Sequence, residues 1–356
     1  MSSQMVITGV GCVSPAGIGQ LDAALALSGT PTTNSGFRVP EFDLGDYLRN
    51  ARYFRRIANS TKFALAAVSL ALGDSNPDLG GEDRARTGVV IGVTHGAMGF
   101  STLFHEELLK DGPGAASPMF FAESVLNAPA GNVAIAFGIR GPVHTVIGEE
   151  TVGAQALDLA LELIRSGAVD RCVVAGTEEW SGVTEGVYRQ MDRVASRSLT
   201  QEREIPLLGE GAAAIVVEDA EGASRRDAAI RIPVLSVRCW RDMGESMEDS
   251  VGRIVREELA FRGVAERTVS HVVLPTGRNR GLVTRGVFRA LGPASQAIRR
   301  LDIGPAAGNP FGAAALFQTA ASVAWLSSGE TADVGLILSS GIEKTFSIIF
   351  LGGGAG

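Results

Sequence analysis

The chain has 356 residues, of which 45% are hydrophobic and 20% are charged, a composition typical of a globular protein with a large core. Its formal net charge of −7 excludes nucleic acid as an expected partner, because a phosphate backbone would repel an acidic surface. No apolar run reaches the ~18 residues of a membrane span, and the N-terminal segment resembles a strand rather than a signal peptide. We therefore expect a cytoplasmic protein with no membrane contact.

Cysteine and histidine usage indicates neither a disulfide scaffold nor a metal centre. Cys12, Cys172 and Cys239 are widely spaced, and an odd number leaves one unpaired in any scheme, so we expect reduced thiols. The four histidines show no metal-ligand spacing. We expect no metal and no cofactor.

Short apolar runs alternate along the chain with longer segments of helical period. We predict strands at residues 5–9, 88–92, 144–147, 172–176, 214–218, 271–274, 335–339 and 346–351. We predict helices at residues 63–72, 152–166, 250–262 and 312–327. In the helix from residue 152, apolar residues recur at intervals of three and four, and Gly167 is a natural stop.

The chain contains 45 glycines, clustered between the apolar runs, as in α/β folds with many tight turns. A polar stretch at residues 219–227 separates two portions that each resemble a strand–helix–strand assembly. We therefore predict an N-terminal half at residues 1–225 and a C-terminal half at residues 226–356.

Several segments, taken in order, resemble the β-ketoacyl synthase family over nearly the whole chain. They are MVITGVG at 5–11, RTGVVIG at 86–92, Gly141-Pro142, VVAGTE at 173–178, GEGA at 209–212, Gly304, and GAAA at 312–315. Each piece is weak alone, but the ordered set is specific.

The resemblance implies an α/β thiolase fold, in which two similar halves form a five-layer αβαβα sandwich. Members of the family normally pair through the strand that leads to their nucleophile. That implication places a dimer interface on Val143, His144, Thr145, Val146 and Ile147.

The residues of ketosynthase chemistry are missing at the positions that the resemblance assigns. A ketosynthase needs a cysteine thiolate at a helix N-terminus and two histidines from two C-terminal loops. Counting from Gly141-Pro142 puts Glu150 at the nucleophile position, and we expect Pro275 and Pro305 at the two histidine positions. A late glycine-rich loop of the family is also changed, at residues 339–343.

The pair Glu149-Glu150 has two interpretations. Acidic residues in a first helical turn offset the helix dipole, which stabilises a helix by roughly 0.3–1 kcal/mol. Alternatively, the pair resembles the Glu-Gln of chain-length factors, the inactive partners of type II polyketide ketosynthases. A degenerate relative with another role and an active variant stay open. We expect His144 and His271 to be core or strand-end histidines, and Cys12 and Cys172 to be packing residues.

Our interpretation is a non-catalytic, chain-length-factor-like subunit that pairs with a cysteine-bearing ketosynthase and meets acyl carrier protein through that complex. The resemblance places tunnel residues within 117–133, where Phe120, Phe121 and Val125 are candidates and core packing is the alternative. The alternative function is a free-standing acyltransferase or hydrolase that uses Glu150 as base or nucleophile.

Overall fold

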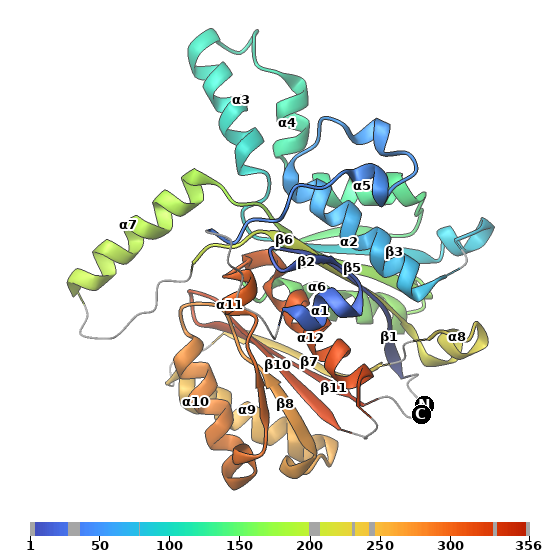
Figure 1. Ribbon diagram of the computed structural model, residues 1–356, viewed down its shortest axis with the longest axis vertical. Coiled ribbons are helices and arrows are strands. Elements are labelled where there is room, and N and C mark those ends of the chain that lie inside the picture. The colour runs from blue at the N-terminus through green and yellow to red at the C-terminus, as the bar shows by residue number, and fades with distance from the viewer. Residues whose placement is uncertain are drawn as a thin grey trace.

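The structure is a computed structural model that describes residues 4–27, 36–77, 79–198, 207–229, 232–241, 246–329 and 333–353. Side chains are described throughout these ranges except at residues 192–198. Figure 1 shows the chain with its helices and strands labelled.

The N-terminal half contributes one mixed sheet with strand order β4-β3-β5-β6-β1. The parallel strands β4, β3 and β5 lie on one side, and β6 and β1 follow in antiparallel orientation. The bounds are β1 (Met5–Ser14), β3 (Thr87–Val93), β4 (Val143–Ile147), β5 (Arg171–Glu178) and β6 (Gly211–Asp219), with the short β2 (Gly17–Gly19) paired to β1.

The C-terminal half repeats this arrangement. Its order is β9-β8-β10-β11-β7, again with three parallel strands followed by two antiparallel ones. The bounds are β7 (Ile232–Arg241), β8 (Val269–Val273), β9 (Arg299–Leu301), β10 (Val334–Ser340) and β11 (Thr345–Gly352). The two sheets meet where β1 pairs briefly with β7, at Val6 with Pro233 and Ile7 with Ile232.

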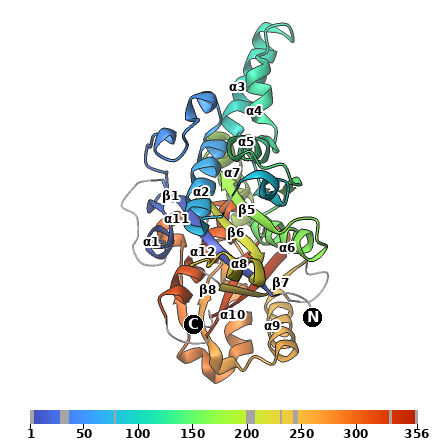
Figure 2. The same cartoon turned by 90° about the vertical axis from the view of Figure 1, so that its right-hand side faces the viewer.

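Helices form three layers around these two sheets, as Figures 1 and 2 show. The helices α2 (Asn59–Ser75) and α5 (Ala128–Phe137) cover the outer face of the first sheet. The helices α6 (Val152–Arg165) and α12 (Ala314–Ser327) lie between the sheets, and α9 (Met247–Arg262) and α10 (Arg280–Leu291) cover the second. This is the predicted five-layer αβαβα sandwich.

The strands are buried on both faces, and neighbouring residues enter different layers. Val174 belongs to the central core between the sheets, whereas Val173 packs under α2. Gly9 and Gly11 let β1 approach α2 closely, because a Cβ there would lie 2.2 and 2.1 Å from helix carbonyl oxygens. The continuous apolar runs of the sequence follow from this double burial.

The predicted elements agree closely with the observed ones. Each predicted run overlaps a strand or helix of the same type, and the last helix begins at Ala314 after a 3₁₀ turn over Phe311–Ala313. The stripe on α6, which includes Leu157 and Leu161, is buried as expected. Strand β7 was not predicted, because it carries Pro233 and is only half-buried. Strand β9 and the helices over Met98–Asp111, Gly182–Ser198 and Arg280–Leu291 were not predicted either.

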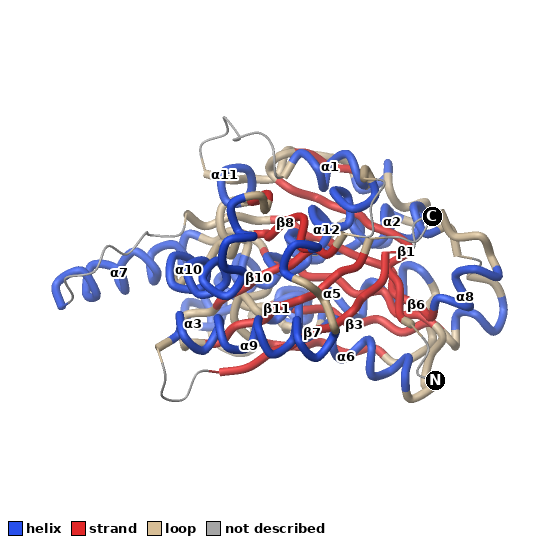
Figure 3. The backbone as a smooth tube through the Cα atoms, turned by 90° about the horizontal axis from the view of Figure 1, so that it is seen from below, coloured by secondary structure: helices blue, strands red, loops and turns tan. Residues whose placement is uncertain are grey.

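Two features project from the sandwich. The helices α3 (Met98–Asp111) and α4 (Pro118–Ser124) form an arm at the top of Figures 1 and 2, and neither helix has a buried residue. The helix α7 (Gly182–Ser198) extends from one side in Figures 1 and 3. The remaining short helices are α1 (Leu21–Ala26), α8 (Ala220–Arg225) and α11 (Gly304–Ala307).

Within the described ranges, no helix combines the length and apolarity that crossing a bilayer requires.

Candidate functional site

Glu150 lies between the edge strand β4 and helix α6, one residue before the helix N-cap. Its side chain points into the molecule, and only 2% of the residue is exposed. Burial raises the pKa of its carboxyl from 4.5 to about 7, with the neighbouring carboxylate of Glu149 acting in the same direction. The hydrogen bond from Asn309 and the nearby imidazole of His95 act in the opposite direction.

Asn309 is the side chain that holds this carboxyl. Its Nδ2 donates to Glu150 Oε1 at 3.1 Å, and its Oδ1 accepts from the Thr276 hydroxyl at 3.2 Å and from the Phe311 N–H at 3.3 Å. Asn309 is itself buried. One amide therefore joins Glu150 to the loop after β8 and to the segment before α12.

The loop after β8, residues 274–279, also reaches the carboxyl directly. A Cβ placed on Gly277 would lie 3.4 Å from Glu150 Oε1, so the backbone passes close to the acid. Pro275, which we expect at the first histidine position, is buried two residues earlier in this loop.

Pro305, which we expect at the second histidine position, is exposed at the start of α11. Asn309, four residues later, donates to the Glu150 carboxyl. Asn309 was not among the predicted site residues. A signal existed in the sequence, because Gly308-Asn309 lies just before the small-residue run GAAA at 312–315, with Pro310 and Phe311 between them.

A ring cluster adjoins this site and was also missed. His95 follows β3, and its ring packs edge-on against Phe311 at 4.6 Å, while Tyr188 of α7 lies 4.9 Å from Phe311 between ring centroids. The Tyr188 hydroxyl lies 3.2 Å from His95 Nε2. Burial and the acids Glu150 and Glu178 raise the pKa of Tyr188.

Glu178, at the end of β5, fixes the backbone under these rings. Its carboxylate accepts the N–H groups of Thr94, His95, Gly96 and Gly312 at 3.1–3.4 Å. Phe311 sits beside it with a φ of 41°, a backbone conformation that costs a bulky residue on the order of 1–3 kcal/mol.

The other candidate nucleophiles and bases lie elsewhere. His271 is buried between the hydroxyls of Ser322 and Ser270, and burial lowers its pKa to about 4. His144 is exposed on β4. Cys12 and Cys172 are fully buried, and burial raises the pKa of both thiols, which disfavours a thiolate.

The arrangement around Glu150 can hold or release one proton near neutral pH. Among the described residues, no group of three or more His, Cys, Asp or Glu side chains is placed to bind a metal ion. The carboxyl is buried and accepts from Asn309, so a group that binds it in place of that amide would have to displace Asn309.

The predicted interface residues lie on an edge strand of the sheet. Among the strands that the structure describes, β4 pairs with β3 alone, and Val143 and Ile147 are 41% and 59% exposed. A groove of about 740 Å³ runs between β4 and the segment from Ser124 to Gly131, and Val125 lines it.

The other predicted tunnel residues join the two helices of the arm. Phe120 packs edge-on against Phe100 of α3 at 5.6 Å, and Phe121 packs against Phe104 at 5.5 Å. Phe121 remains 54% exposed. The arm thus presents apolar surface close to the end of α4, where Ser124 lines the groove.

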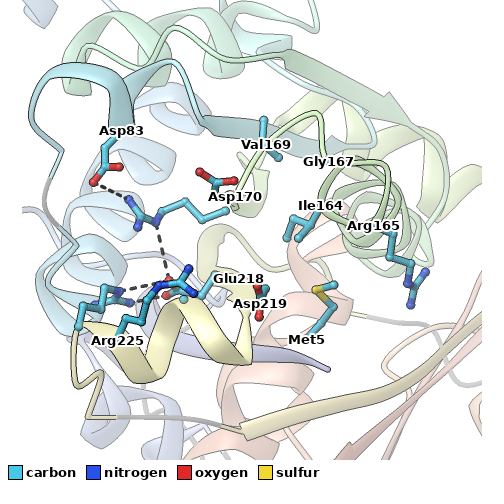
Figure 4. Close-up of a pocket in the computed structure, with 13 residues that line it drawn as sticks. Met5, Asp83, Ile164, Arg165, Gly167, Val169, Asp170, Glu218, Asp219 and Arg225 are labelled. Carbon is cyan, nitrogen blue, oxygen red and sulfur yellow. Dashed lines mark hydrogen bonds and ion pairs between the residues drawn. The ribbon is translucent and has the colours of Figure 1, made fainter. Parts of the chain in front are cut away.

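A separate cavity of about 630 Å³ opens at the far end of α6, about 21 Å along the helix from Glu150. Its lining is charged and includes Asp83, Glu218 and Arg225, which Figure 4 labels. Arg171 pairs with Asp83 at 3.4 Å and lies 3.8 Å from Glu218. Arg226 also pairs with Glu218. These charges neutralise one another and fasten α8 to the sheet.

Comparison with known proteins agrees with this geometry. The family model described as "Beta-ketoacyl synthase, N-terminal domain" matches residues 30–223. The 3-oxoacyl-[acyl-carrier-protein] synthase 2 of Vibrio cholerae is 29% identical over 323 residues, covering 82% of this chain and 78% of the relative. The enzyme of the same name from Rhizobium meliloti is 30% identical over 265 residues, or 65% and 63%.

Solved structures match over almost the full length. The ishigamide ketosynthase/chain length factor aligns with a TM-score of 0.79 and 25% identity, covering 98% of this chain and 99% of that one. A type II polyketide ketosynthase in complex with its acyl-carrier protein, AntDE:AntF, aligns with a TM-score of 0.81 and 18% identity, covering 99% and 100%. At 18% identity, the likeness to AntDE:AntF shows a shared fold alone.

Proposed function

Because this chain belongs to the β-ketoacyl synthase family, we propose that it is the non-catalytic, chain-length-factor-like subunit of a ketosynthase pair. In this role it covers the active site of a cysteine-bearing partner and shapes the tunnel for the growing acyl chain. The acyl carrier protein meets the subunit through that complex.

One observation carries the proposal: a buried glutamate occupies the start of α6 and is hydrogen-bonded by an asparagine. Decarboxylative condensation needs a thiolate to carry the acyl group and imidazoles to assist the extender. Glu150 and Asn309 supply neither, and we assign the second histidine position to Asn309 rather than Pro305.

The partner interface in this proposal is strand β4 with the arm beside it. An exposed edge strand with apolar side chains is prone to pair with another strand, and natural proteins usually protect such edges. Pairing β4 with its counterpart would cover Val143 and Ile147, and the arm would bring Phe120 and Phe121 against the partner. Obligate interfaces typically bury more than roughly 2,000 Å².

We retain the division into halves at residues 225 and 226 as a proposal. It is supported by the repeated strand order, with β7 beginning the second set of five strands.

The test is co-expression with a cysteine-bearing ketosynthase of the same biosynthetic system, followed by reconstitution with acyl carrier protein. We expect a stable heterodimer whose condensation needs the partner's cysteine and tolerates Glu150→Gln in this chain. A monomer or homodimer that ignores the partner, or a fully assembled Glu150→Gln complex that no longer condenses, would contradict the proposal.

A second candidate function rests on one specific observation, which is that burial raises the pKa of Glu150 to about 7. A carboxyl with that pKa could act as a general base in an acyltransferase or hydrolase. Thioester turnover by the purified chain alone, abolished in Glu150→Gln, would select this function over the first.

A further inference from the structure

The two adjacent glutamates before α6 contact different loops of the C-terminal half. Glu150 contacts the segment at Asn309, whereas Glu149 contacts the turn between β10 and β11, residues 341–344. The carboxylate of Glu149 accepts the Glu343 N–H at 3.2 Å with both oxygens and the Thr345 hydroxyl at 2.6 Å. Charged acceptors make the stronger hydrogen bonds in proteins.

The turn fits tightly against the glutamate. A Cβ on Gly341 would lie 1.9 Å from Glu149 Oε2, so only glycine leaves room for the carboxylate. Glu149 is partly buried and lies two residues before the N-cap of α6, Thr151, and its carboxylate accepts from Glu343 and Thr345 of the C-terminal half. Dipole compensation alone therefore does not account for it.

The loops that the glutamates contact are also bonded to one another. Thr276 donates to Asn309, and Asn279 Nδ2 donates to the Gly341 carbonyl at 2.7 Å. A Cβ on Gly277 would lie 2.4 Å from the Ser340 carbonyl oxygen, which places the loop after β8 directly against the end of β10. Three segments, 274–279, 308–311 and 341–344, thus close over the start of α6.

We propose that Glu149 and Glu150 form a two-carboxylate clamp that holds these three segments closed over the nucleophile position. Glu149 ties down the 341–344 turn, Glu150 ties down the 308–311 segment, and the loop after β8 is held between them. The inference rests on the proposed function in one respect, which is that the partner carries the acyl chain. The closed clamp keeps this subunit from accepting that chain.

The clamp predicts local changes in amide hydrogen exchange, measured on the isolated chain. In Glu149→Ala, the amides of 341–345 should exchange about tenfold faster, a change of about 1.4 kcal/mol in local opening, while 308–312 stays protected. Thr345→Val should have a smaller effect, because Glu149 keeps the Glu343 N–H. In Glu150→Leu, which removes the acceptor but keeps the volume, the faster exchange should move to 308–312.

Glu162→Ala is the matched control, because Glu162 is an exposed acid on α6 that lies outside these contacts. Unchanged exchange at 341–345 in Glu149→Ala would overturn the clamp. Exchange that rises equally across the whole chain, with a lower melting temperature, would overturn it too, because that pattern reports general destabilisation.

A second readout tests whether the clamp guards an acyl site. The fluorescent fatty acid 11-(dansylamino)undecanoic acid should bind Glu149→Ala about tenfold more tightly than the unmodified chain, since opening and affinity scale together. Faster exchange without tighter binding would refute the guarding role. Both readouts use the chain alone, so they fail independently of a missing heterodimer, which would count only against the proposed function.

Discussion

Replacing Glu150 by glutamine tests the electrostatics of the buried site directly. Glutamine keeps the shape and the oxygen that accepts from Asn309, but it cannot ionise. In the folded chain the carboxyl has a pKa of about 7, compared with 4.5 when solvated, so the fold binds the proton more tightly than the unfolded chain does. This stability is fully present below pH 4.5 and is lost as the pH rises through about 7.

The magnitude follows from the size of the pKa rise. At ~1.36 kcal/mol per pKa unit, a rise of about 2.5 corresponds to about 3 kcal/mol, an upper value because the site can relax. Unfolding entropy of ~2.1 cal/mol/K per residue gives about 0.75 kcal/mol/K for this chain, so 3 kcal/mol corresponds to about 4 °C.

We therefore expect the melting temperature of Glu150→Gln minus that of the unmodified chain to increase by up to about 4 °C between pH 5 and pH 8.5. Differential scanning calorimetry at constant ionic strength measures both proteins. Glu162→Gln, at an exposed acid on the same helix, is the matched control for the loss of one carboxylate. A flat difference for Glu150→Gln would refute the reasoning, because it would mean that the carboxyl is solvated or ion-paired.

Three further predictions concern assembly and chemistry. The isolated chain should form no covalent adduct with malonyl- or acetyl-carrier protein, and a stoichiometric acyl shift in intact-mass spectrometry would contradict the non-catalytic role. Ile147→Lys should weaken the heterodimer at least tenfold in sedimentation analysis, whereas Phe261→Lys, at an exposed apolar residue of α9, should leave it unchanged. Phe120→Ala and Phe121→Ala should lengthen the product without stopping condensation. Phe104→Ala controls for loosening of the arm. Unchanged product lengths in both Phe120→Ala and Phe121→Ala would remove the tunnel assignment.

The regular elements were predictable because their signals are local. A strand that is buried on both faces requires a continuous run of apolar residues. A helix between two sheets, such as α6, requires apolar residues at intervals of three and four, so both kinds of element can be recognised in the sequence. The place of Glu150 between a strand and a helix was also predictable, because one strand and one turn fix its distance along the chain from Gly141-Pro142.

The contacts of that glutamate depended on the tertiary structure. Asn309 lies 159 positions from Glu150 in the sequence, and spacing within a loop cannot tell whether Pro305 or Asn309 faces the acid. The same holds for Glu149 and the 341–344 turn, and for His95 meeting Tyr188.

Local sequence therefore determined the doubly buried strands, the helices marked by an apolar stripe, and the position of Glu150 between β4 and α6. Only the packing of the two halves against each other decided which side chains surround it, because burial, hydrogen bonding and the raised pKa of Glu150 arise from residues that the fold brings together across that boundary.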